Sequence, residues 1–300
     1  MIWFKRQQTM NDEKLQAIDL YLLFKGSVCR KDLIVHFDIA TATASRALKE
    51  YREFTPGNLN YLPEKRVYVP SKEFEPAFHH DVNRALSLLA YGENLKTMEP
   101  EGQNQMPKVP VITQSMSWRS VHGVTRAFAE NKHCHIRYHS TGEGGLARTV
   151  RPHSIFKVGS VWYFRAGETN QASGYVDFKT FRFSRLVSSE VIIESNPEQN
   201  LESDLAWLNE VTVTIGPNPK HLSLEALRSD LGLNDQPIKN IYVKEALVGM
   251  VLSSLRVDSS EHGLLNPNEY QLRLFNRHEL SDMPGMKIAP GFNLSEEDTK

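Results

Sequence analysis

The chain has 300 residues, of which 40% are hydrophobic and 24% are charged, and its net charge is −1. At about 150 residues per domain, this length predicts two domains or three small ones. The composition excludes collagen-like, disulfide-scaffold and wholly disordered chains. The longest apolar run, residues 246–252, is far shorter than the ~20 residues of a membrane helix. The first ten residues have no apolar signal region and there are two cysteines, so we expect a cytoplasmic protein without framework disulfides or membrane contact.

The charge is unevenly distributed along the chain. Residues 1–70 hold 11 Lys/Arg against 8 Asp/Glu, and residues 131–187 hold 9 against 3, so both stretches are basic. Residues 188–300 hold 9 against 18 and are acidic. Two basic regions joined to an acidic one predict contact with a polyanion in the front part of the chain and a different role behind it.

The first 78 residues predict a winged helix-turn-helix domain. Apolar residues recur at helical spacing over residues 12–24 until Gly26, and two further helices are expected at 30–37 and 41–54. Pro56-Gly57 ends the third helix, and residues 58–70 are typical of a β-hairpin with a charged tip. Three short helices followed by a hairpin are the outline of this DNA-binding fold.

The third predicted helix has two different faces. Ala44, Ala47, Leu48 and Tyr51 fall on the face that is expected to pack. The opposite face carries small residues and donors near its N-terminal end, as a recognition helix requires for close approach to base edges. An ordinary surface helix in a bundle is the alternative. The residues predicted to contact DNA, from this helix and the hairpin tip, are Thr41, Ala42, Thr43, Ser45, Arg46, Lys49, Lys65 and Arg66.

A helical linker region is predicted at residues 79–130. It contains helices at 79–91 and 118–130, separated by a stretch rich in Gly, Pro, Asn and Gln at 92–110. Residues 133–139 then alternate as a strand, which places His133, His135 and His139 on one face. Arg137 lies among these histidines without a nearby carboxylate, so an exposed strand face is favoured and no metal is expected. Further strands at 149–157, 161–166 and 176–185 complete a small sheet.

The C-terminal part predicts a small α+β domain at residues 201–278. Strands are expected at 211–215, 238–244 and 270–275, with helices at 222–231 and 245–255 between them. Residues 279–300 show no periodicity and are expected to form a flexible tail. The predicted fold class is therefore α+β and multidomain.

Residues of the middle region resemble a known family. Trp162-Tyr163-Phe164, which follows Arg151-Pro152-His153, resembles the signature of the WYL domain, with Phe where the family has Leu. The segments IRYHS at 136–140 and FKTFRFSRL at 178–186 resemble two further segments of that domain. The resemblance implies a small β-rich, Sm/SH3-like WYL domain at 131–195, in which we expect the Trp and Tyr of the signature to serve packing.

The whole chain is similar to WYL-type bacterial transcription regulators, which have a winged helix-turn-helix, a WYL domain and a C-terminal extension in this order. The segment FDIATATASRALKEYRE looks most like regulators encoded with BREX and CBASS anti-phage defence islands. That resemblance implies a dimeric repressor of its own defence operon. Ala40 stands where those regulators usually carry a capping Ser, and Thr41 is expected to cap the helix instead.

The resemblance also implies a polar pocket on the sheet that senses a nucleotide or nucleic acid. Carried over to this sequence, the effector-binding residues are Tyr138, Ser140, His153, Lys179 and Arg185. Lys179 stands where Arg is usual, which replaces a bidentate fork by a point charge.

Physical chemistry supports Arg185 in part. Alternation predicts that it shares a strand face with Phe181 and Phe183, where a guanidinium needs a partner. A phosphate matches it bidentately. Pairing with Asp177 or Glu168, or with backbone carbonyls, is the alternative.

The sequence thus predicts a homodimeric, sequence-specific repressor that binds an inverted-repeat DNA operator and is released by an anionic effector. The alternatives are an accessory nucleic-acid-binding module for a partner enzyme, or an enzyme acting on nucleotides. The acids of the basic middle region, Glu143, Glu168 and Asp177, lie on separate segments, and no acid can be placed to orient Ser140 and His153. We therefore expect no catalysis and no cofactor.

Overall fold

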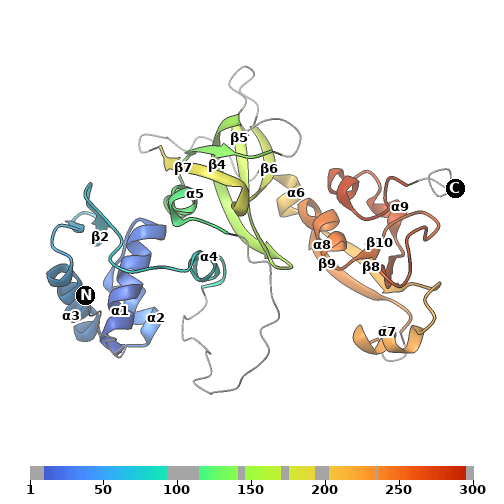
Figure 1. Cartoon of the computed structure of the whole chain (residues 1–300), viewed down its shortest axis with the longest axis horizontal. Coiled ribbons are helices and arrows are strands. Elements are labelled where there is room, and N and C mark those ends of the chain that lie inside the picture. Colours follow the sequence, from blue (N-terminus) through green and yellow to red (C-terminus); the bar gives the residue numbers. More distant parts are fainter. Residues whose placement is uncertain are drawn as a thin grey trace, which may run out of the picture. The chain divides into compact units, whose positions relative to one another are not determined.

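The computed structural model describes residues 10–92, 115–140, 146–169, 176–192, 203–233 and 236–294. The chain divides into two compact units (Figure 1). The first comprises Met1–Phe156 with Trp162–Gln199, and the second comprises Lys157–Val161 with Asn200–Lys300. Most of the expected linker at 92–110 lies outside the described residues. No helix in the described part of the chain is long and apolar enough to cross a bilayer.

The first unit begins with the predicted three helices and hairpin. The elements are α1 (Met10–Leu20), a π-helical turn (Tyr21–Lys25), α2 (Arg30–Phe37), α3 (Thr41–Phe54), β1 (Leu59–Leu62) and β2 (Val67–Pro70). Gly26 ends the first helix at φ 80° and Asp38 ends the second at φ 54°, both in the left-handed region. The antiparallel hairpin pairs Leu62 with Val67, and Val28 bridges Tyr68 from the loop before α2.

Two longer helices lead into the central sheet. α4 (Val82–Tyr91) starts three residues later than predicted, because Asp81 caps it by accepting hydrogen bonds from the N–H groups of Asn83 and Arg84. α5 (Trp118–Glu130) has the predicted bounds and is capped by Ser117. Both helices contribute apolar side chains to the core.

The central sheet has five strands in the order β6-β5-β4-β3-β7. They are β3 (Cys134–Tyr138), β4 (Leu146–Val158), β5 (Val161–Thr169), β6 (Val176–Arg182) and β7 (Leu186–Val191). The prediction of one strand through Arg185 is wrong. Residues Phe183–Arg185 form a 3-10 turn, which brings the unpredicted β7 back against β3.

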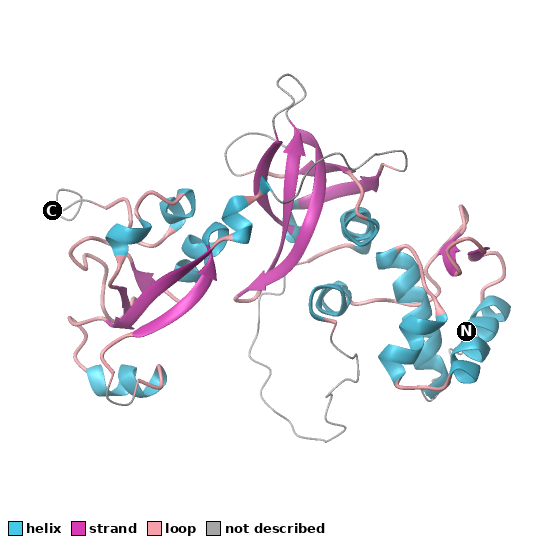
Figure 2. Ribbon diagram, turned by 180° about the vertical axis from the view of Figure 1, so that it is seen from behind, coloured by secondary structure: helices cyan, strands magenta, loops and turns pink. Residues whose placement is uncertain are grey.

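One continuous core joins the winged helix, α4, α5 and the central sheet. Ile18, Leu86, Val124 and Phe164 are fully buried in it, one from each of these parts. α5 packs closely on β7 at Gly123, where a Cβ atom would lie only 2.5 Å from the carbonyl of Ser189. The helix therefore lies against the sheet (Figure 2).

The second unit is a small α+β fold built on the four-stranded sheet β10-β11-β8-β9. Its strands are β8 (Glu210–Pro217), β9 (Lys239–Lys244), β10 (Val257–Asp258) and β11 (Leu272–Leu274). Its helices are α6 (Leu205–Leu208), α7 (Leu224–Asp230), α8 (Val248–Ser254) and α9 (Arg277–Leu280), with 3-10 turns at Glu245–Leu247 and Pro284–Ile288. The multidomain α+β class predicted from the sequence is confirmed.

The flexible tail expected at residues 279–300 is not what the structure shows as far as residue 294, because this segment contributes to a core. Met286 and Ala289 are buried in the same core as Val248 and Leu252. A Cβ atom on Gly249 of α8 would overlap the carbonyl oxygen of Gly285, so the glycine allows this close approach. Residues 279–294 are thus packed through a few separate buried side chains, which leave no periodic pattern in the sequence.

Candidate nucleic-acid interface and effector site

The two faces predicted for α3 are present in the structure. Ala44, Ala47, Leu48 and Tyr51 are buried. The residues predicted to contact DNA lie on the other side: Thr41, Ala42, Arg46 and Lys49 are exposed, and Thr43 and Ser45 are half-buried. The packing half of the prediction is confirmed, whereas DNA contact by the outward half stays a prediction.

The N-terminus of α3 is open. The expectation that Thr41 caps the helix is wrong, because Thr41 is its first helical residue and Ala40 holds the capping position without a side-chain bond. The first N–H groups of a helix have no intrahelical partner, and its N-terminus attracts phosphate. The start of α3 is therefore suited to an anionic ligand.

The cations around this helix are available for a ligand. Arg46 makes no hydrogen bond or ion pair with any described residue. Lys49 pairs with Glu53 at 3.7 Å, but the two side chains are 68% and 62% exposed, so the pair contributes only about 0.5 kcal/mol. Lys65 and Arg66 are exposed at the hairpin tip, where Arg66 has φ 55°.

A buried carboxylate holds α3 in place. Asp19 on α1 is fully buried and accepts hydrogen bonds from the Tyr51 hydroxyl of α3 and from the N–H groups of Ala77 and Phe78. His80 Nε2 lies 2.7 Å from the same carboxylate. Because these groups belong to three separate segments, Asp19 fixes α3 relative to α1 and to residues 77–80.

Arg126 joins the winged helix to α5. Its Nε donates to the carbonyl oxygen of Leu23 at 2.7 Å, and its Nη2 donates to that of Leu22 at 3.0 Å. The last carbonyl oxygens of a helix have no N–H donor within the helix, and a cation at this end is favourable. Burial lowers the pKa of the Arg126 guanidinium below its ordinary value.

Three of the predicted effector residues come together where β3 ends. Tyr138 is buried, and its hydroxyl accepts a hydrogen bond from the N–H of Arg182 at 2.9 Å. The N–H of His139 donates to the carbonyl oxygen of Arg185 at 3.0 Å. Tyr138, Ser140 and Arg185 therefore border one corner of the sheet, at the turn from β6 to β7.

Arg185 does not pair with Asp177 or Glu168, the ion pairs that were the alternative to a bound anion. Glu168 is bonded by Arg148 Nη1 at 2.8 and 2.9 Å and by Lys179 Nζ at 2.8 Å. Asp177 pairs with Lys179 at 3.1 Å. The half-buried Arg185 side chain has no hydrogen bond or ion pair within the described ranges, so its guanidinium is available to an anion.

Lys179 and His153 lie in different surroundings from that corner. Burial alone would raise the pKa of Glu168, but hydrogen bonds and charges from Lys179 and Arg148 outweigh it and hold this pKa below its ordinary value of 4.5. The hydrogen bond to Glu168 raises the pKa of Lys179. His153 Nδ1 lies 3.0 Å from Ser154 Oγ, and its ring meets Phe178 edge-on. Lys179 is therefore committed to an ion-pair network.

Two arginines that the sequence reasoning missed lie on one face of the β5–β6 pair. Arg165, 8% exposed, is opposite Thr180 and donates to its hydroxyl at 3.3 Å, and Arg182 is opposite Tyr163. The Nε of Arg182 is buried without a hydrogen-bond partner among the described residues. Leaving such a donor unsatisfied costs about 1–3 kcal/mol, which a bound anion would offset. The sequence signal that could have identified Arg165 and Arg182 is their alternation with apolar residues along the two strands.

The other candidate groups of the sheet have packing roles or remain on its surface. Trp162 is buried and Tyr163 stacks on Phe156 at 5.8 Å, as expected of packing residues. His135 and Arg137 are exposed on β3. No three His, Cys, Asp or Glu side chains come together as metal ligands in the part of the chain that the structure describes.

Comparison with known families assigns both parts of the first unit. A model for the BrxR transcriptional regulator winged helix-turn-helix domain matches residues 11–91, and the WYL domain model matches residues 120–191. The chain therefore contains a winged helix domain of the BrxR type, followed by a WYL domain. The resemblance inferred from three short segments of the sheet is confirmed.

Particular relatives carry a more specific name. The chain is similar to the DNA-binding transcriptional repressor CapW of Escherichia coli strain KTE188, with 26% identity over 283 residues and 90% of each chain covered. CapW of Pseudomonas aeruginosa is 25% identical over 287 residues, which is 91% of each chain. Among solved structures, proteasome accessory factor B/C (PafBC) of Arthrobacter aurescens is matched over 97% of this chain and 50% of that chain, with 16% identity and a TM-score of 0.26.

Proposed function

We propose that this protein is a homodimeric DNA-binding transcriptional repressor that acts in the cytoplasm on an inverted-repeat operator. The observation that carries the proposal is α3, whose packing face is buried while its uncapped N-terminus and Arg46 face outward. A dimer presents two such helices to successive major grooves, roughly one helical turn or a multiple apart. The names of the CapW relatives support repression as the direction of control.

The proposal extends to an anti-phage defence operon as the target and an anionic nucleotide or nucleic acid as the effector. The similarity of the α3 segment to regulators of defence islands supports the target. Among the described residues, the guanidinium of Arg185 has no ion-pair partner and the Nε of Arg182 has no hydrogen-bond partner, which supports an anionic effector at the corner beside Tyr138. Release of the operator requires that the effector bind the free arrangement more tightly than the DNA-bound one.

Operator binding by an Arg46→Ala variant tests the role of α3. Arg–guanine contacts are the commonest specific base contacts, so we expect a loss of about 1–3 kcal/mol and relaxed specificity. The measurement is a titration of the protein's own upstream region against random DNA, with the dimer verified by light scattering.

Arg52→Ala is the matched control for this experiment, because Arg52 is also exposed on α3 but lies on another face of the helix. It should leave discrimination unchanged. If Arg46→Ala discriminates operator from random DNA as well as the wild type does, α3 is not the recognition helix.

The effector corner is tested with Arg185→Ala. We expect the variant to keep its melting temperature and operator affinity, to repress a reporter, and to fail to derepress during phage infection. Arg137→Ala, an exposed arginine on β3, should induce normally. Joint loss of stability and repression would make Arg185 a structural residue, and normal induction would exclude it from effector binding.

A further inference from the structure

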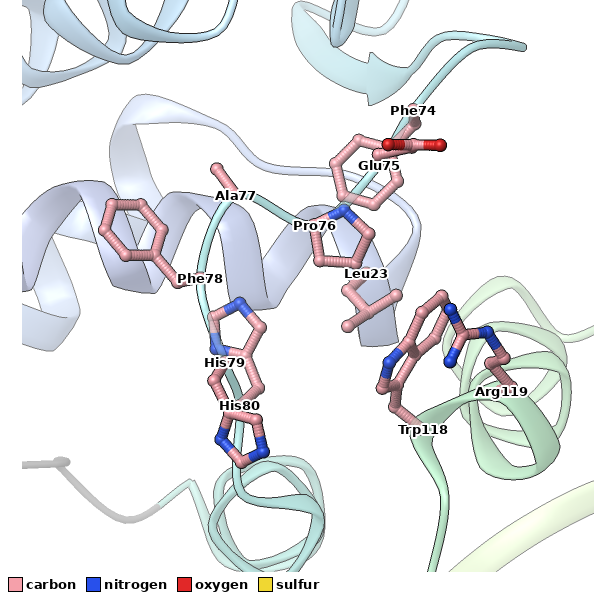
Figure 3. A pocket seen from close by; sticks show the side chains of 10 residues that line it. All are labelled: Leu23, Phe74, Glu75, Pro76, Ala77, Phe78, His79, His80, Trp118 and Arg119. Carbon is pink, nitrogen blue, oxygen red and sulfur yellow. The ribbon is translucent and has the colours of Figure 1, made fainter. Parts of the chain in front are cut away.

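A cavity lies in the first unit, and none of the proposed effector residues lines it. It has a volume of about 640 Å³ and is bounded by residues 74–80, Leu23 of the π-helical turn and the start of α5. Figure 3 shows His79 and His80 on one side and Trp118 with Arg119 on the facing side, with Leu23 and Pro76 between them. This volume lies within the ~300–1,000 Å³ typical of small-molecule sites.

The polar groups of this pocket favour an anion. The Arg119 guanidinium lies 4.7 Å from the centre of the Trp118 ring and has no acidic partner among the described residues. His79 is exposed and also makes no ion pair there, whereas His80 is bonded to Asp19. Trp118 and Arg119 are the first two residues of the 13-residue α5, whose N-terminus adds positive partial charge. Glu75 is the single carboxylate in the wall.

The remaining walls favour a planar ring. Trp118 is half-buried and presents its indole to the space opposite the histidines, and Leu23, Phe74 and Pro76 supply apolar surface. Aromatic rings gain from stacked or edge-on contacts, and a guanidinium binds carboxylate or phosphate oxygens with charge-assisted hydrogen bonds. The two preferences meet on one side of the pocket, because Arg119 adjoins Trp118.

We propose that this pocket binds a small aromatic anion, with its ring against Trp118 and its carboxylate or phosphate against Arg119 and His79. The ligand would contact two walls that belong to different parts of the unit. One wall, residues 77–80, is bonded to Asp19, and the other begins α5, which packs on β7 at Gly123. A ligand that contacts both walls stabilises their present arrangement by mass action. This site is independent of the operator-binding proposal.

Calorimetric titration of the full chain tests the site. The probes are 4-hydroxybenzoate for a carboxylate, adenosine 5′-monophosphate for a phosphate, and phenol and adenosine as their neutral counterparts. We expect at least one anion to bind about tenfold more tightly than its neutral counterpart, since a charge-assisted hydrogen bond contributes on the order of this factor. Inorganic phosphate alone should bind more weakly than the aromatic anion.

The variant Arg119→Gln should weaken binding of that anion by about tenfold, whereas Arg30→Gln, which removes an exposed arginine on α2 outside the pocket, should not change it. Circular dichroism verifies that both variants fold, and His79→Gln provides a second test of the same rim. Absence of saturable binding by either anion would overturn the proposal. So would equal affinity of the wild type and Arg119→Gln, or equal weakening by Arg30→Gln.

Discussion

The contact between α5 and β7 can be tested by replacing Gly123 with Ala. In a free helix this change stabilises by about 1 kcal/mol. Here the new Cβ atom would lie 2.5 Å from the carbonyl carbon and oxygen of Ser189, and these backbone atoms cannot rotate away. Either α5 or β7 has to move by about 1 Å to restore ordinary contact, and overpacking of this kind costs about 1–3 kcal/mol.

The same movement stretches the hydrogen bond from Ser189 Oγ to the carbonyl oxygen of Ser120, which is 2.6 Å long and contributes about 1 kcal/mol. The propensity gain is therefore outweighed, and we expect Gly123→Ala to lower the free energy of unfolding by about 1–3 kcal/mol. Urea unfolding followed by circular dichroism measures it. Ala129→Gly, at an exposed position of α5, is the propensity control. A Gly123→Ala protein as stable as the wild type, or more stable, would refute the close contact.

Two other features of the first unit lead to predictions about stability. Asp19→Asn places an amide N–H₂ against groups that now donate hydrogen bonds to the carboxylate, so we expect the free energy of unfolding in urea to fall by about 3–5 kcal/mol. The control Glu13→Gln, at an exposed position of the same helix, should leave stability unchanged. An unchanged unfolding midpoint for Asp19→Asn would contradict the role of the carboxylate. Burial, and then nearby arginines, hold the pKa of His36 and His122 below 6.5, so the folded state binds fewer protons than the unfolded chain. Their contribution to stability is therefore full above pH 6.5 and is lost as the pH falls below it. Melting temperatures from pH 8 to 5 measure this loss. The double variant His36→Gln/His122→Gln should show a flatter dependence of melting temperature on pH, and the same dependence in variant and wild type would exclude these histidines as the cause.

Much of the first unit could be predicted because its signals are local. The bounds of α2, α3 and α5 follow from apolar periodicity within one helix, and Gly26 and Asp38 mark the ends of the first two helices. The strand β7 could not be found in this way, because Ser189 occupies one of its buried positions. That serine is buried since its hydroxyl bonds to Ser120, 69 residues earlier in the chain. A pattern of apolar residues does not contain this information.

Of the two candidate sites, one could be predicted from the sequence and the other could not. The outward face of α3 could be predicted because a helical wheel needs only the spacing of Ala44, Ala47, Leu48 and Tyr51. The environment of Arg185 could not, since extending β6 by alternation ignores the 3-10 turn that the pairing of β7 with β3 requires.

The contacts that position α3 are beyond sequence patterns for a related reason. Asp19 meets His80 across 61 residues, and Arg126 meets Leu23 across 103. Such contacts depend on how separate elements pack, and a single sequence gives no signal for that packing.

The contacts of α5 show how a repressor of this architecture can connect the proposed effector corner to α3. On one side Gly123 and Ser120 meet β7 directly after the corner that holds Arg182 and Arg185. On the other side Arg126 holds two carbonyls of the π-helical turn. π-turns are rare and occur frequently at functional sites, and this one continues α1, where Asp19 bonds Tyr51 of α3. Coupling between two sites requires physical elements that both sites bias. Under the proposed function, α5 and the π-helical turn are the elements that would carry such a bias, because α5 contacts β7 on one side and the π-helical turn on the other.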